Sequence, residues 1–103
     1  MTAQHQFAVV EGASITAPQG FAACGLHCGI KKTERFDLGA IFCRVPAAAA
    51  AVYTQNVVRA APLKITKESI DQERTLQAVV VNSGNANACT GSQGEENARR
   101  MRS

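Results

Sequence analysis

An apolar, β-branched run that ends abruptly in small and polar residues is the feature that most constrains this sequence. Residues 76–82 read LQAVVVN, and the following SGNANACTG contains no side chain larger than asparagine. A continuous valine run bounded by turn residues is typical of a strand that is covered on both faces. The pattern therefore predicts a strand over 76–82 that leads directly into a tightly folded loop.

A helix is predicted to follow this loop. Ser92 and Glu95 have the S-x-x-E spacing of a capping box, which predicts a helix that begins at Ser92. Within that helix, Glu95 can pair with Arg99, and Glu96 with Arg100, at the i to i+4 spacing. The order of strand, loop and helix indicates an α/β protein.

The loop between them is a candidate binding site. Backbone N–H groups and the helix dipole together favour an anion or a developing oxyanion at such a position. A purely structural loop is the alternative, because asparagine readily hydrogen-bonds to its own backbone. Thr90 has no base nearby in the sequence, which favours a turn or cap role over a nucleophilic one. The candidate site residues are Asn82, Ser83, Gly84, Asn85, Asn87, Thr90 and Gly91.

The rest of the chain is predicted to consist mainly of strands. Short alternating or apolar runs predict strands at 7–12, 26–32, 37–44 and 50–58, and the last two are close enough to form a hairpin. Val45 and Pro46 are expected to end the 37–44 strand. One short helix is predicted in 61–74, capped by Thr66 with Glu68 in its first turn.

Composition narrows the function classes. Hydrophobic residues make up 46% of the chain, but many are alanines and only 5% are aromatic, so the core should be thin. The net charge of +3 comes from scattered residues, which argues against a nucleic-acid interface. No apolar run approaches the roughly 20 residues that span a bilayer. The N-terminal MTAQHQFAVV lacks the pattern of a secretory signal, so a cytoplasmic protein with reduced cysteines is expected.

The four cysteines raise the question of a metal site, which the sequence favours less than free thiols. Cys24 and Cys28 flank His27 in a C-x3-C pair, while Cys43 and Cys89 stand alone. This spacing fits no zinc pattern well, and each cysteine has small or apolar neighbours in the sequence. We therefore expect four free thiols and no metal site, with His27 not acting as a ligand.

Three blocks of the sequence together resemble a known family. They are ITAPQGFAACGLHCGIKK, DLGAIFCRVPAAAAAVYTQNVVRAAPLKIT and LQAVVVNSGNANACTGSQG. Their order and spacing are similar to the N-terminal part of the bifunctional ornithine acetyltransferase/glutamate N-acetyltransferase family of arginine biosynthesis. The asparagine-rich block is the most specific of the three.

The resemblance implies an α/β protein that cleaves itself into an α chain and a β chain. The N-terminal Thr of the β chain would take the acetyl group from N-acetylornithine and pass it to glutamate, activated by its own α-amine. Acetyl-CoA is a co-substrate in some members, and no other cofactor is implied. The family's oxyanion Thr-Gly pair belongs to a separate S-T-G block, so that role is not carried over to Thr90 and Gly91.

Residues 1–103 are therefore expected to form a single incomplete domain, the N-terminal segment of the α chain, with no catalytic residue of their own. The expected partners are the remainder of the α chain and the β chain, and the isolated chain should be inactive. Its sheet should expose unpaired edges and a bare surface. Two alternatives stay open, namely a small cytosolic anion-binding module that uses the Asn82–Gly91 loop, and a cysteine-based metal or redox protein.

Overall fold

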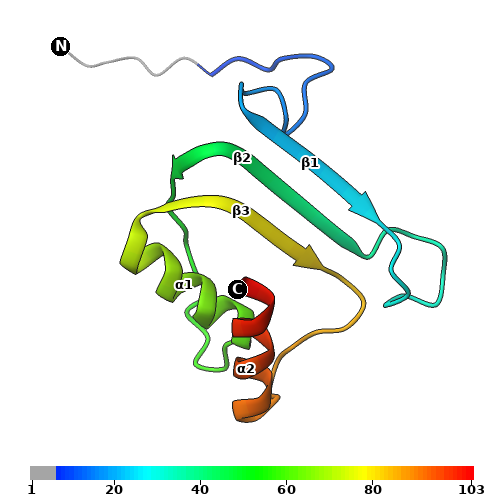
Figure 1. Ribbon diagram of the computed structural model, residues 1–103, viewed down its shortest axis with the longest axis vertical. Coiled ribbons are helices and arrows are strands. Elements are labelled where there is room, and N and C mark those ends of the chain that lie inside the picture. Colours follow the sequence, from blue (N-terminus) through cyan, green and yellow to red (C-terminus); the bar gives the residue numbers. More distant parts are fainter. Residues whose placement is uncertain (1–6) are drawn as a thin grey trace.

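The computed structural model describes residues 7–103 and contains a three-stranded antiparallel sheet beside two helices (Figure 1). The elements follow the order β1 (Phe21–Leu26), β2 (Leu38–Ala48), α1 (Ala61–Glu73), β3 (Thr75–Asn82) and α2 (Gly91–Arg102). The sheet order is β1-β2-β3, so β1 and β3 are both edge strands within the described residues. The predicted α/β class is confirmed.

The strand prediction over 76–82 is confirmed, since β3 covers Thr75–Asn82. Its expected burial on both faces is wrong for this chain, because Val79, Val80 and Val81 remain 43%, 47% and 55% exposed. β3 pairs with β2 alone, and no second layer of the described chain closes over its outer edge.

The hairpin predicted between 37–44 and 50–58 is wrong, because β2 forms a hairpin with the preceding strand β1 instead. β1 and β2 pair in a continuous register from Phe21↔Cys43 to Leu26↔Leu38. The strands predicted at 7–12, 26–32 and 50–58 are wrong, because these residues form turns, bends and irregular loops apart from Leu26. Alternation of apolar residues in 26–32 misled the prediction, since Asp37 draws this segment into a loop through backbone hydrogen bonds.

Pro46 does not end β2, contrary to the sequence prediction. The strand continues to Ala48, and its register against β3 shifts between Phe42 and Ala47. Proline cannot donate a hydrogen bond to the ladder, so strands tolerate it at such irregularities. The structure places Pro46 within that irregular stretch.

Helix α1 begins before the predicted Thr66 cap. Its N-cap is Ala60, and Pro62 occupies the first turn, where a missing N–H costs nothing. The helix ends at Arg74, which adopts the left-handed conformation with φ of 57° and donates its N–H to the Ile70 carbonyl. β3 begins at the next residue, so this one residue makes the turn from helix to strand.

The fully buried core is small, as the composition predicted. The buried hydrophobic residues of the described chain are Cys43, Ala61, Ile65 and Ala98, and the last three form one cluster between α1 and α2. The expected bare surfaces are confirmed by many exposed large side chains, including Phe42 and Leu26 on the sheet. Among residues 7–103, no helix has the length and apolarity to cross a membrane. The predicted absence of a signal sequence concerns the N-terminus, whose residues 1–6 lie outside the described chain.

Candidate functional site

The candidate site lies at the end of the sheet where β1 and β3 end and β2 begins. Leu26 on β1 and Asn82 on β3 are both paired with Leu38 on β2, so the loops that follow the two outer strands start at one edge. The loop 27–36 and the loop 83–90 meet there. The Ser83 N–H donates to the Asp37 carbonyl over 2.9 Å, which joins the second loop to the start of β2.

Asparagine side chains fold the 82–91 loop. The Asn82 amide donates to the Asn85 carbonyl over 3.1 Å, and the Asn87 amide donates to the Gly94 carbonyl over 2.8 Å. The Asn87 carbonyl also accepts the Ala61 N–H over 3.1 Å, at the beginning of α1. The loop therefore anchors the first turns of both helices, and its amides make hydrogen bonds of the kind that the structural alternative describes.

The predicted capping box at Ser92 is wrong. Helix α2 begins at Gly91, its N-cap is Thr90, and no side chain caps it by a hydrogen bond. The Thr90 hydroxyl donates instead to the Asn87 side-chain oxygen. Gly91 has a left-handed φ of 64° and so turns the chain from the loop into the helix.

Gly94 is a residue that the sequence analysis missed. It is buried in the first turn of α2, and a Cβ added there would collide with the Thr90 side chain and lie 2.5 Å from the Asn87 side-chain oxygen. Only glycine leaves room for the Asn87–Thr90 pair. A glycine inside an otherwise helical stretch was the signal that could have found it.

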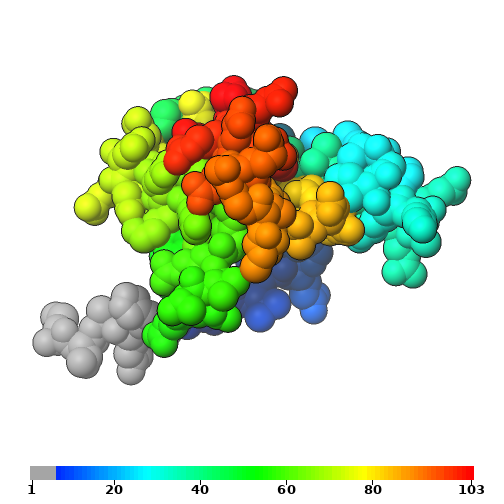
Figure 2. All heavy atoms as spheres, turned by 90° about the horizontal axis from the view of Figure 1, so that it is seen from below, coloured from blue at the N-terminus to red at the C-terminus, as the bar shows by residue number. Residues whose placement is uncertain are grey.

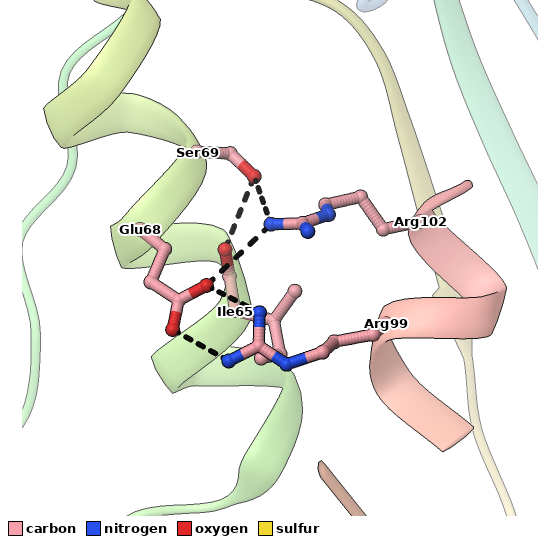
Figure 3. A network of polar contacts seen from close by, with 5 residues as sticks. All are labelled: Ile65, Glu68, Ser69, Arg99 and Arg102. Carbon is pink, nitrogen blue, oxygen red and sulfur yellow. Dashed lines mark hydrogen bonds and ion pairs between the residues drawn. The ribbon is translucent and has the colours of Figure 1, made fainter. Parts of the chain in front are cut away.

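The predicted ion pairs within α2 are also wrong, since Glu95 and Arg99 bridge to α1 instead and Glu96 and Arg100 form no ion pair within the described residues. Lys64 pairs with Glu95 at 2.9 Å, and Arg99 donates two hydrogen bonds to the Glu68 carboxylate at 2.7 and 2.8 Å (Figure 3). Arg102 also contacts Glu68 and Ser69. Arg99 thus holds the pKa of Glu68 below its ordinary value. The two helices are joined along one side by these charges.

Asp37 organises the loop that follows β1, and the sequence analysis missed it too. Its carboxylate is fully buried and accepts the backbone N–H groups of Cys28 at 2.8 Å and Lys31 at 2.9 Å. These donors hold the pKa of Asp37 well below its usual range, although burial opposes them. His27 completes the cluster, with Nδ1 3.2 Å from the carboxylate and 3.0 Å from the Arg35 carbonyl.

Lys31 joins the 27–36 loop to the 82–91 loop by a direct contact. Gly84 adopts a left-handed φ of 97°, and a Cβ built on it would lie 2.7 Å from the Lys31 Cγ. The aliphatic part of Lys31 therefore crosses Gly84 in direct contact. Asp37 positions Lys31 through its backbone, so the two loops are fixed relative to each other.

The seven candidate residues do not converge on one point. Asn82, Asn85 and Asn87 line a groove of about 610 Å³ between β3 and the two helices, whereas Ser83 lines a smaller hollow beside Phe36 and Asp37. Gly84 contacts Lys31, while Thr90 and Gly91 form the entry to α2. Asn85 differs from the other two asparagines because its side chain makes no hydrogen bond within residues 7–103.

The cysteines do not gather into a common site. The strand register places Cys24 and Cys43 on opposite faces of the sheet, since Cys24 is opposite Ala40 and Cys43 is opposite Phe21. All four are free thiols, of which only Cys43 is buried. Desolvation and the Asp37 carboxylate raise the pKa of the Cys28 thiol, which disfavours a reactive thiolate. The described residues contain no group of three or more side chains suited to a metal ion.

Comparisons with known proteins identify the class of fold. The chain superposes with a TM-score of 0.84 and 41% identity on a Mycobacterium tuberculosis structure described as ornithine acetyltransferase complexed with ornithine, covering 89% of this chain and 48% of that one. It superposes with a TM-score of 0.87 and 58% identity on the arginine biosynthesis bifunctional protein ArgJ from Bacillus halodurans, covering 90% and 48%. The fold is thus that of a segment of an ornithine acetyltransferase.

The family follows from the sequence comparisons. The ArgJ family model matches residues 22–103. The chain is 60% identical over 93 residues to the arginine biosynthesis bifunctional protein ArgJ of Bacillus thuringiensis, and 58% identical over 93 residues to that of Halalkalibacterium halodurans. The chain belongs to the ArgJ family. It spans about 22% of the length of these curated relatives.

Proposed function

We propose that this chain is the N-terminal part of an acetyltransferase that moves the acetyl group of N-acetylornithine to glutamate in arginine biosynthesis. One observation carries the proposal, namely the superposition with a TM-score of 0.87 at 58% identity over 90% of the chain. Relatives of this similarity are described as bifunctional proteins of arginine biosynthesis. The Mycobacterium tuberculosis structure, described as a complex with ornithine, supports a substrate of this type.

The lengths of the relatives support a two-chain enzyme. The same 90% of this chain corresponds to 22% of the curated Halalkalibacterium halodurans protein but to 48% of the crystallised Bacillus halodurans chain. A crystallised chain of this family is therefore less than half as long as the curated protein. This difference agrees with the division into α and β chains that the sequence resemblance implies, and it supports our proposal that the present chain belongs to the α chain.

In this proposal the chain supplies a rigid wall of the active site and no nucleophile. The 82–91 loop is held by its own asparagines, by the start of α1 and by Asp37. Loops fixed in this way by a scaffold are suited to position substrate. Asn85 is the loop residue whose amide is free to face a ligand, since its side chain lines the groove without an internal hydrogen bond. The proposed partners are the remainder of the α chain and the β chain, in the cytoplasm.

An acetyl-transfer assay from N-acetylornithine to glutamate tests the proposal. The chain alone should release no ornithine above background, whereas the chain supplied with the downstream polypeptide of the Bacillus thuringiensis relative should restore transfer. Ornithine release by the chain alone would contradict the assignment of the nucleophile to another segment. No transfer by the combined polypeptides, while the intact relative is active in the same assay, would contradict the proposed function.

A matched pair of variants tests the role of the loop in the combined protein. Asn85→Ala removes the unengaged amide, and we expect at least roughly a tenfold loss of transfer with an unchanged melting temperature. Asn97→Ala is the control, since Asn97 lines the same groove from α2 and its side chain, within residues 7–103, hydrogen-bonds with the exposed Gln93 alone. Equal activities of the two variants would show that the loop is purely structural.

A further inference from the structure

The Lys31 side chain is held against the 82–91 loop at both ends of its stem. Its backbone N–H donates to the buried Asp37 carboxylate over 2.9 Å. The stem then crosses Gly84, since a Cβ built on that glycine would lie 2.7 Å from the Lys31 Cγ and 3.5 Å from its Cε. Cε is the last carbon before the ammonium group. Packing of the apolar stem therefore keeps the charged group of Lys31 beside this loop.

The ammonium group of Lys31 has no counter-charge in the described part of the chain. Lys31 is half-buried, yet its Nζ makes neither an ion pair nor a hydrogen bond within residues 7–103. Lys64 and Lys67, by contrast, lie 2.9 Å and 2.5 Å from a carboxylate oxygen. Partial burial removes water from an ammonium group and so disfavours its charge, unless an anion binds to it.

Asp37 does not supply this missing anion. Its side chain is fully buried, and its two oxygens accept the backbone N–H groups of Cys28 and Lys31, with His27 Nδ1 at 3.2 Å. The carboxylate thus orients the backbone of Lys31 and leaves the charge at the far end of that side chain uncompensated.

The loop beside Lys31 suits a carboxylate ligand. Asn85 follows Gly84 directly, and its side-chain amide lines the groove without a hydrogen bond within residues 7–103. An ammonium group binds a carboxylate through a charge-assisted hydrogen bond, and a neutral amide can donate a second one. N-acetylornithine and glutamate, the substrates of the proposed function, have an α-carboxylate in common. Because an acetyl-enzyme mechanism binds the two substrates in turn, one cation can serve both.

We propose that the Lys31 ammonium group binds the α-carboxylate of the amino-acid substrate, with Asp37 as the positioning residue that fixes the Lys31 backbone. The proposal rests on the proposed function, since it names the substrate group that the 82–91 loop receives. The competing partner is a carboxylate of the polypeptide that completes the enzyme, which would make the role of Lys31 structural.

Calorimetric binding of three ligands to the combined protein tests the proposal. In this protein the chain is joined to the downstream polypeptide of the Bacillus thuringiensis relative. Glutamate has both carboxylates, glutamine keeps only the α-carboxylate, and isoglutamine keeps only the side-chain carboxylate. Lys31→Gln removes the charge but keeps a carbon at the Cγ position that contacts Gly84. It should weaken the binding of glutamate and glutamine at least roughly tenfold and that of isoglutamine less than about twofold.

Two further variants separate charge from structure. Lys31→Arg keeps the positive charge and should recover most of the glutamate affinity that Lys31→Gln loses. Lys32→Gln is the matched control, because it removes the same charge from the exposed neighbour and should leave all three affinities unchanged. In the acetyl-transfer assay, Lys31→Gln should raise KM for glutamate far more than it lowers kcat, as expected for a contact made equally in the ground state and the transition state.

The outcomes distinguish the site from the function. Equal losses for glutamine and isoglutamine, with a lowered melting temperature, would give Lys31 a structural role and overturn the proposal. A loss for isoglutamine but not for glutamine would overturn the assignment to the α-carboxylate. Unchanged glutamate binding by Lys31→Gln, in a protein that transfers acetyl groups, would overturn the site alone. Binding of glutamine that depends on Lys31, without any acetyl transfer, would contradict the proposed function and support the site.

Discussion

The helix pair and the sheet of this chain differ in how fully they bury their contact surfaces. α1 and α2 lie side by side (Figure 2) and enclose Ala61, Ile65 and Ala98. They are joined by the Lys64–Glu95 pair and by the Glu68–Arg99 pair, which Figure 3 shows. The strands of the sheet are paired by hydrogen bonds, with one irregularity between Phe42 and Ala47, but the sheet leaves apolar side chains exposed and one valine-rich edge open within the described residues. Backbone pairing is therefore continuous between β1 and β2 and interrupted only around Pro46 between β2 and β3, whereas the buried apolar cluster lies between the helices.

Hydrogen bonding of the backbone and burial of apolar side chains are separate requirements for a stable fold. A strand pair satisfies its facing N–H and C=O groups as soon as it forms, whatever covers its faces. Net stability, however, comes mainly from apolar area removed from water. In this chain that contribution is concentrated at the helix contact, although most of the large apolar side chains belong to the sheet and the loops.

The largest effect should come from opening the helix contact. Ile65 is 3% exposed, and Ile65→Ala should lower the free energy of unfolding by roughly 2–4 kcal/mol because it leaves a cavity. Val80→Ala is the matched change in the sheet, where the side chain is 47% exposed, and should cost less than about 1 kcal/mol. Urea unfolding of both variants measures the two values. Equal costs would contradict the contrast between helix pair and sheet.

A smaller loss should follow from crowding the beginning of α2. Gly94→Ala forces a methyl group into the Asn87–Thr90 pair and should cost roughly 1–3 kcal/mol. Ser92→Ala is the control, because Ser92 makes no capping hydrogen bond and alanine favours a helix. Thermal melts of both variants measure the effect. If Ser92→Ala lowered the stability as much as Gly94→Ala, this would support a capping role for Ser92 and contradict the structure.

The third effect concerns the loop at the sheet edge and should depend on pH. The pKa of Asp37 is depressed in the folded chain, so its stabilisation is fully present above the unfolded value of about 3.9 and is lost as the pH falls toward the folded value. Asp37→Asn should therefore flatten the acid side of the stability profile and speed amide exchange in 27–36. Asp71→Asn, at an exposed pair, is the control. An unchanged profile for Asp37→Asn would contradict the role of its backbone donors.

The smallest effect should be a gain in stability at Arg74, the residue where helix α1 leads into strand β3. Arg74 holds a left-handed φ of 57°, a conformation that costs a non-glycine residue energy. Arg74→Gly should stabilise the chain by about 0.5–1 kcal/mol, since the relief of strain exceeds the added chain entropy. Denaturant unfolding measures the gain, and Arg74→Ala should show none. Destabilisation by glycine would indicate that the arginine side chain contributes contacts.

Local sequence determined a limited set of features. The run LQAVVVN specified β3 because consecutive β-branched residues favour extended backbone, and the asparagine-rich stretch specified a self-bonded loop. The start of β2 and the small core followed from composition and pattern as well. The resemblance to the family was also present in the sequence, and the match over residues 22–103 confirms it.

Tertiary structure decided the rest, because the partners are far apart in the chain. The buried Asp37 turned an alternating stretch into a loop, and Glu95 and Arg99 found partners on α1 about thirty residues away instead of each other. Gly94 mattered only because the Asn87–Thr90 pair lies against it. Periodicity and spacing report what a segment prefers alone, whereas the elements that it meets determine its register, its contacts and which of its faces are buried.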